Sequence, residues 1–134
     1  MRVLFIPCGK KPEVREIDGS LESMQQLVGG LIQAVYPFDD PVALICNDEG
    51  KLMGLPLNRA LRDDNGQIYD VVAGTFLIAG LSEDNFASLS PELIAKYEKR
   101  FKYPEMFIPF DGKLAVVPVK ENTIRNRIKS NFER

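Results

Sequence analysis

Two arginines that lie three residues apart are the side chains of this sequence best suited to hold a charged ligand. Arg59 and Arg62 follow Asn58, and each guanidinium group offers a planar fork of donors that matches a phosphate or a carboxylate. We expect residues 58–61 to form a short helical turn, which would place both guanidinium groups on one side. The alternative is a solvated helix edge on which the arginines pair with Asp63 and Asp64.

Aromatic residues elsewhere in the sequence would complete a nucleotide-sized pocket around these arginines. The candidates are Tyr36, Phe38 and Tyr69. Two adjacent glycines, Gly29 and Gly30, would let the backbone approach a ligand closely. They follow an expected helix, however, and the end of a helix is the wrong end for binding an anion. The alternative is that the glycines only end the helix.

The basic end of the chain is a candidate for nucleic-acid binding. Arg125, Arg127 and Lys129 are spread around Ile124 and Ile128, which lie four residues apart. These cations would contact phosphates or an acidic partner. We favour a short amphipathic helix that docks on the rest of the protein through its two isoleucines, because exposed aromatic residues and groove-binding motifs are missing.

Histidine is absent, and this excludes several classes of enzyme. Without it there are no Ser-His or Cys-His triads and few routes to a catalytic zinc site. Cys8 and Cys46 end apolar, strand-like runs, and we interpret them as small buried residues. Acidic pairs such as Asp39–Asp40 lack the spacing of an EF-hand. We therefore expect no enzymatic activity, no metal site and no cofactor.

Length and composition are those of one ordinary globular domain. The chain has 134 residues, of which 45% are hydrophobic and 27% charged, with a formal net charge of −2. A net charge this close to zero does not indicate nucleic-acid binding. No apolar run approaches the length of a membrane span, and the N-terminus lacks the layout of a signal peptide. We expect a cytoplasmic protein of one domain, residues 1–134, with no internal linker.

Hydrophobic periodicity predicts a compact α+β fold. The opening is strand, strand, helix, at residues 1–8, 13–17 and 21–28, with the second strand half-buried. Further strands are expected at residues 31–36, 42–46, 69–72 and 75–79. They would form a mixed, mostly antiparallel sheet. An edge strand such as residues 3–6 would allow two copies to dimerise.

The C-terminal segment, residues 83–134, is expected to contain a helix, a hairpin and the basic tail. Ser82 is expected to begin a short helix. The run Ser90-Pro91-Glu92 begins a second helix, with Ser as cap, Pro in the first turn and an acid near the helix N-terminus. Strands at residues 106–110 and 114–119 would form a hairpin across Asp111-Gly112.

Several motifs occur in an order that resembles a known family. They are residues 11–30, 47–51, 54–60 and 74–78. This pattern is similar to the domain of unknown function numbered 3846, and the resemblance covers about residues 1–82. It implies a protein of the kind carried by bacteriophages, prophages and conjugative elements, often those of Firmicutes. It implies no established activity, so no catalytic residue is carried over.

That context implies a protein that acts by binding. We expect a non-enzymatic module that binds a host protein stoichiometrically and thereby counters host defence. The alternative is a sponge that sequesters a nucleotide signal through Asn58, Arg59, Arg62 and nearby aromatic residues. A third hypothesis is a nucleic-acid-binding accessory protein that uses the basic tail.

Overall fold

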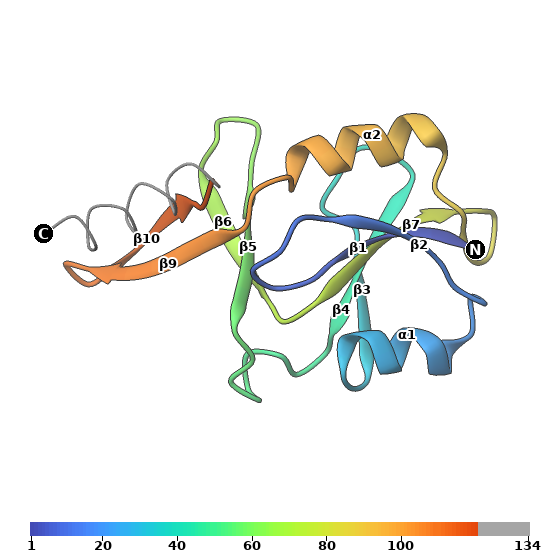
Figure 1. Ribbon diagram of the computed structural model, residues 1–134, viewed down its shortest axis with the longest axis horizontal. Coiled ribbons are helices and arrows are strands. Elements are labelled where there is room, and N and C mark those ends of the chain that lie inside the picture. The colour runs from blue at the N-terminus through green and yellow to red at the C-terminus, as the bar shows by residue number, and fades with distance from the viewer. Residues whose placement is uncertain (121–134) are drawn as a thin grey trace, which may run out of the picture.

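The computed structural model describes residues 1–120, and it confirms the expected α+β fold with a C-terminal helix and hairpin (Figure 1). Its elements in chain order are β1 (Arg2–Ile6), β2 (Glu13–Glu16), α1 (Leu21–Val28), β3 (Ile32–Val35), β4 (Val42–Asn47), β5 (Leu57–Arg62), β6 (Ile68–Ala73), β7 (Phe76–Leu81), β8 (Phe86–Ala87), α2 (Pro91–Arg100), β9 (Glu105–Phe110) and β10 (Lys113–Pro118). Within these residues, neither helix is long and apolar enough to cross a membrane.

A six-stranded antiparallel sheet forms the centre of the structure. Its order is β2-β1-β7-β4-β3, and the short β8 pairs with the end of β7. The prediction that residues 3–6 form a sheet edge is wrong, because β1 lies between β2 and β7. The prediction that the second strand is half-buried is also wrong. β2 is an edge strand whose four residues are all exposed.

The two helices cover opposite faces of this sheet (Figure 1). Side chains alternate along each strand, so Val3 packs beside Met24 and Val28 of α1, whereas Leu4 packs on the face that holds α2. On that second face, the rings of Phe76 and Phe101 meet edge to face with centroids 5.4 Å apart. The sheet is therefore buried on both sides.

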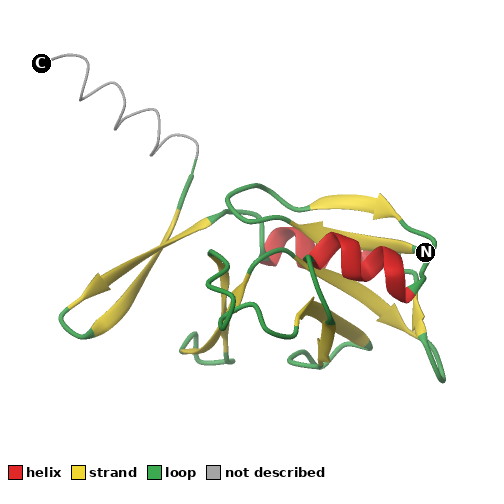
Figure 2. Cartoon of the chain, turned by 90° about the horizontal axis from the view of Figure 1, so that it is seen from below, coloured by secondary structure: helices red, strands yellow, loops and turns green. Residues whose placement is uncertain are grey.

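Two hairpins lie outside the central sheet. Among the described strands, β5 pairs only with β6, and its register shifts near both ends. The expected helical turn at residues 58–61 is wrong, since these residues lie within β5. β9 and β10 form the expected hairpin, and Asp111 and Gly112 both have positive φ, as a tight two-residue turn requires. This hairpin projects from the body in two perpendicular views (Figures 1 and 2).

Local capping signals mark the start of α2 and the end of α1. The hydroxyl of Ser90 accepts a hydrogen bond from the backbone N–H of Leu93, and Pro91 occupies the first turn of α2, as the sequence predicts. Gly29 has a left-handed conformation with φ 81° and ends α1. The helix expected from Ser82 does not form. Residues 83–85 form a bend instead, and the chain continues into β8.

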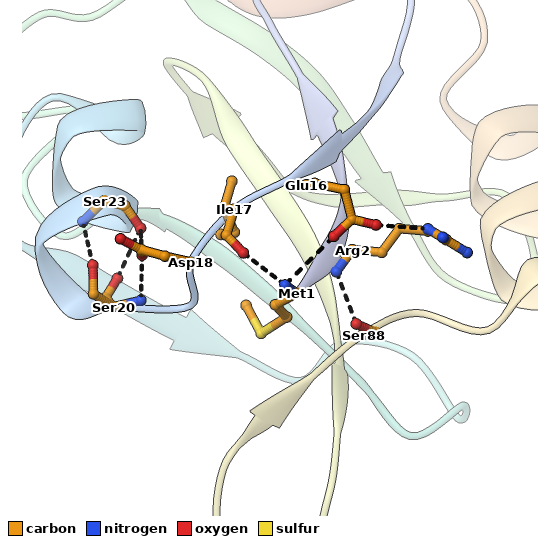
Figure 3. Close-up of polar contacts among 8 residues, drawn as sticks. All are labelled: Met1, Arg2, Glu16, Ile17, Asp18, Ser20, Ser23 and Ser88. Atoms are coloured by element: carbon orange, nitrogen blue, oxygen red, sulfur yellow. Dashed lines mark hydrogen bonds and ion pairs between the residues drawn. The ribbon is translucent and has the colours of Figure 1, made fainter.

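The start of α1 is held by a small polar network (Figure 3). Ser20 caps the helix by accepting from the backbone N–H of Ser23. The carboxylate of Asp18 accepts from the Ser23 hydroxyl at 2.7 Å and from the Ser20 backbone N–H at 2.8 Å. The Ser23 hydrogen bond is the largest reason why the pKa of Asp18 falls to about 2. Next to it, the Met1 nitrogen donates to the Ile17 carbonyl at 2.6 Å.

Replacing Asp18 with Asn should therefore change how stability depends on pH. The folded-state pKa lies below the unfolded value of about 3.9, so the stabilising contribution is present above that value and disappears as the pH falls towards 2. Thermal unfolding should show a lower midpoint for Asp18→Asn at neutral pH, and the gap from the parent protein should close in acid. Asp84→Asn, in an exposed turn, is the matched control. A gap for Asp18→Asn that stays constant between about pH 5 and 2 would contradict this account.

Candidate functional site

The guanidinium group of Arg59 lies inside the protein. The residue is 1% exposed. Nε and Nη2 donate to the carbonyl of Phe101 at 3.2 and 3.1 Å, and Nη2 also donates to the carbonyl of Lys10 at 2.7 Å. Nη1 donates to the side chain of Asn58 at 2.6 Å. Burial lowers the pKa of Arg59, while the nearby Glu105 carboxylate acts to raise it. Carbonyl oxygens of the protein therefore already occupy the donors that a phosphate would need.

Asn58 belongs to the same cluster of buried hydrogen bonds as Arg59. Its Nδ2 donates to the carbonyls of Ile6 and Gly74, at 2.9 Å in each case. The residue is 1% exposed, so these contacts tie β5 to the end of β1 and to the turn before β7. Asn58 and Arg59 together join four segments that are far apart in the sequence. In this structure the two residues connect the β5–β6 hairpin to the body.

Arg62 is turned towards a different partner. Its Nη2 donates to Oε2 of Glu105 at 2.7 Å, and Oε1 of the same carboxylate accepts from the backbone N–H of Ala60 at 2.8 Å. The Glu105 side chain is only 7% exposed. The predicted pairing of Arg59 and Arg62 with Asp63 and Asp64 is therefore wrong. Glu105 could not be recognised from the sequence, because nothing in its local pattern distinguishes it from any other acid that begins a strand.

Three of the predicted site residues do line one hollow, which we call the polar cleft. Phe38, Arg62 and Tyr69 come together there, in a space of about 360 Å³. Its charged lining consists of three cations and four acids: Arg62, Lys96, Arg100, Asp39, Asp40, Asp63 and Asp64. The formal charge of the cleft is thus −1, which does not favour a polyphosphate.

Asp40 is the most strongly held acid of the polar cleft. It accepts from Lys96 at 2.5 Å and from the hydroxyl of Tyr97 at 2.7 Å, and these two hydrogen bonds lower its pKa. Burial first, and then this hydrogen bond to Asp40, raise the pKa of Tyr97. The guanidinium carbon of Arg100 lies 4.8 Å from the centre of the Phe38 ring. Lys96 and Arg100 are therefore already engaged within the protein.

A second hollow, which we call the turn cleft, lies where the β4–β5 turn meets the β5–β6 hairpin. Its volume is about 160 Å³. Apolar side chains of β3, β4, β5 and β6 line its inner part, and polar residues of the turn surround them; the lining is Gln33, Val35, Leu44, Cys46, Asn47, Asp48, Glu49, Gly50, Lys51, Leu52, Leu61, Asp70, Val71, Val72 and Ala73. Lys51 and Asp70 form an ion pair of 2.6 Å. Leu52 is 89% exposed, and its neighbour Met53 is 53% exposed.

Neither cysteine is an activated nucleophile. Burial raises the pKa of Cys46 in the turn cleft, and the charges of Asp48 and Asp70 raise it further. Burial also raises the pKa of Cys8, against the opposing effect of Arg59. Both thiols therefore stay protonated at neutral pH, and the thiol is the unreactive form. Among residues 1–120, no group of acidic or sulfur ligands is arranged to hold a metal ion.

Three further predicted residues, Tyr36, Gly29 and Gly30, are not part of the lining of either cleft. Tyr36 is 61% exposed beside the end of β3. Gly29 ends α1, and a Cβ placed on Gly30 would lie 2.9 Å from Nδ2 of Asn47, so the close approach at Gly30 is to the protein itself. Arg125, Arg127 and Lys129 fall outside the described residues.

Comparison with known proteins identifies the family. The family described as Domain of unknown function (DUF3846) matches residues 1–102. The chain belongs to this family. The match continues beyond the residues 1–82 on which the resemblance rests, and it therefore includes β8 and α2 as well as both clefts. The β9–β10 hairpin lies beyond the family match. No curated protein and no solved structure matches the chain.

Proposed function

We propose that this protein acts by binding a partner protein in the turn cleft, and that it works by occupancy rather than by turnover. The observation that carries the proposal is a hollow of about 160 Å³ that is lined in part by apolar side chains and whose lining includes the 89%-exposed Leu52. Leu52 and its exposed neighbour Met53 lie next to each other in the chain, and adjoining exposed apolar residues beside a hollow are typical of a binding surface. One buried anchor side chain from a partner would supply much of the affinity.

The charges around the turn cleft define the partner further. The lining contains one lysine, Lys51, and three acids: Asp48, Glu49 and Asp70. The rim therefore carries a net negative charge. A partner segment with an apolar anchor and basic residues next to it would complement both parts of the cleft. The protonated thiol of Cys46 adds polarisable, unreactive surface to the interior.

The biological setting is part of the same proposal. We infer a protein of a bacteriophage or another mobile element that acts in the cytoplasm of a bacterial host and counters host defence by occupying a host protein. The resemblance of residues 11–30 and 47–60 to proteins of such elements supports this setting. A compact fold in which the polar groups of Asn58 and Arg59 are used internally also suits a binding module better than an enzyme.

A nucleotide sponge is the second candidate, and the polar cleft is the observation in its favour. Phe38 and Tyr69 would stack on a base there, and Arg62 would meet a phosphate. The four aspartates of the cleft and the bond between Arg62 and Glu105 oppose this reading. If a nucleotide panel raised the melting temperature, the sponge would replace the protein-binding proposal, since ligand at a hundred times its Kd stabilises by about 2.7 kcal/mol.

Leu52→Asp should weaken partner binding while leaving the fold intact. The substitution places a charge on the rim where an apolar contact is expected, so the affinity should fall by about tenfold or more. Stability should change by less than about 0.5 kcal/mol, because Leu52 is almost fully exposed. The measurement is affinity purification of the tagged protein from a bacterial host lysate, followed by titration of the captured protein against each purified variant.

The matched control is Leu21→Asp. Leu21 is also an exposed leucine, at 54%, but it begins α1 on the other face of the sheet. Capture should survive this change. Equal capture by the Leu52 and Leu21 variants, or no stoichiometric partner for the parent protein, would overturn the proposal.

A further inference from the structure

The two edges of the central sheet differ in their protection against further strand pairing. β2 carries Glu13, Arg15 and Glu16, and Arg15 forms an ion pair with Glu13 at 2.5 Å. Charged residues of this kind are a common defence of edge strands, because an added strand would have to cover them. β3, at the opposite edge, has the sequence Ile-Gln-Ala-Val and contains neither a charge nor a proline. β3 is thus the unprotected edge of this sheet.

The edges of the two hairpins do not share this property. β9 contains Pro109 and β10 contains Pro118. Proline has no backbone N–H, so it cannot donate a hydrogen bond to an added strand. β6 contains Asp70, which is engaged with Lys51. Among the longer strands of residues 1–120, β3 therefore stands out as an edge ready to accept another strand.

The backbone of β3 shows which of its groups are available. The carbonyl of Leu31 accepts from the N–H of Asp48 at 2.8 Å, so Leu31 directs its backbone groups towards β4. Because these directions alternate along an antiparallel strand, Gln33 and Val35 also face β4, whereas Ile32 and Ala34 face outwards. The outward N–H and C=O groups of Ile32 and Ala34 have no strand beside them in the described sheet.

We propose that β3 pairs antiparallel with β3 of a second copy of this chain, around a twofold axis that passes beside Gln33. This axis places the outward backbone groups of Ile32 opposite those of the second copy's Ala34, and the reverse pairing follows by symmetry. The two sheets become one continuous antiparallel sheet. Gln33 and Val35 also line the turn cleft, but the test of this proposal measures the oligomeric state and not partner capture.

Side chains fit this register as well as the backbone does. The large Ile32 meets the small Ala34 of the second copy on one face. On the other face Leu31, which is 64% exposed in the single chain, lies opposite the second copy's Val35. At the axis the exposed amide of Gln33 meets its own symmetry copy, and an amide can both donate and accept a hydrogen bond. No pair in this register places like charges together.

A charge-swap experiment tests both the partner and the register. Sedimentation equilibrium of the full chain across a concentration series should give twice 15.1 kDa at the upper end. Gln33→Lys and Gln33→Glu should each give a monomer, because like charges would face each other across the axis. An equimolar mixture of these two variants should restore the dimer. Circular dichroism should show that both variants keep the parent fold, since Gln33 is exposed.

Gln67→Lys is the matched control, because it adds the same charge at an exposed site in the β5–β6 turn. It should dimerise like the parent protein. A parent protein that stays at 15.1 kDa throughout the series would overturn the proposal. A Gln33→Lys variant that dimerises normally, or a mixture that stays monomeric, would do the same.

Discussion

Replacing Arg59 with Ala should destabilise the folded protein by about 3–4 kcal/mol. The substitution leaves the carbonyls of Phe101 and Lys10 without their donor, and it removes the hydrogen bond to the side chain of Asn58. It also opens a void where a side chain that is 1% exposed now packs. Equilibrium unfolding in urea measures the effect as a shift of the midpoint with little change in slope.

Two further variants test whether the loss of stability comes from the buried guanidinium group of Arg59. Arg59→Lys should recover only part of the loss, because one ammonium group cannot span the carbonyls that the guanidinium fork reaches. Arg2→Ala removes an exposed arginine, 48% accessible, that pairs with Glu16, and it should cost less than about 1 kcal/mol. If Arg59→Ala were as mild as Arg2→Ala, Arg59 would be free to act as a ligand residue and its structural assignment would be wrong.

Glu105→Ala should be the next most damaging change, at about 2–3 kcal/mol. The Glu105 carboxylate accepts from the N–H of Ala60 and from Arg62, and it is the acid whose charge acts on the buried Arg59. Its loss leaves a largely buried donor unpaired and the Arg59 cation without this compensation. It also removes the polar link between β9 and β5. Urea unfolding again provides the measurement.

Comparison with two variants isolates the role of the Glu105 charge. Glu105→Gln keeps an oxygen for the Ala60 N–H but loses the charge, so it should lie between the parent protein and Glu105→Ala. Glu98→Ala removes an exposed acid from α2 and should change stability by less than about 0.5 kcal/mol. Equal effects of Glu98→Ala and Glu105→Ala would show that the buried carboxylate contributes nothing to holding the hairpin.

These two predictions affect how any loss of function at Asn58 or Arg59 is interpreted. A variant at either position that no longer binds its partner has first to be shown to fold, because both side chains hold distant segments together. Leu52 and Gln33 do not carry this ambiguity, since both are exposed. Binding is therefore better tested at the rim of the turn cleft and at the β3 edge than at the arginines.

Local signals made most of the elements predictable. Ser20 caps the start of α1, and Gly29 ends that helix. Ser90 and Pro91 begin α2, and Asp111-Gly112 forms the turn of the last hairpin. Each of these signals acts through backbone geometry or a hydrogen bond within a few residues, so it can be recognised without knowing the fold. The errors at residues 58–61 and 82–85 have the opposite cause. At residues 58–61 the pairing of β5 with β6 outweighs a weak local preference for helix, and after residues 82–85 the pairing of β8 with β7 has the same effect.

The candidate site was predictable only in part, for the same reason. Residues 47–51, one of the motifs on which the family resemblance rests, do line the turn cleft. The sequence also grouped Phe38, Arg62 and Tyr69, which line the polar cleft together. It did not find Glu105, because that carboxylate lies more than forty residues along the chain from Ala60 and Arg62. Contact across such a distance depends on the topology of the sheet.

By itself, the sequence determined the α+β class, the caps and turns, and the absence of histidine chemistry, because residue type and local spacing decide these properties. Only the tertiary structure decided that Arg59 is a buried joint, that Arg62 pairs with Glu105, and that β3 rather than β1 is exposed at a sheet edge. The physical reason is that burial and pairing depend on which distant segments pack together. A guanidinium group has the same chemistry in every protein, but its role depends on whether protein carbonyls or solvent surround it.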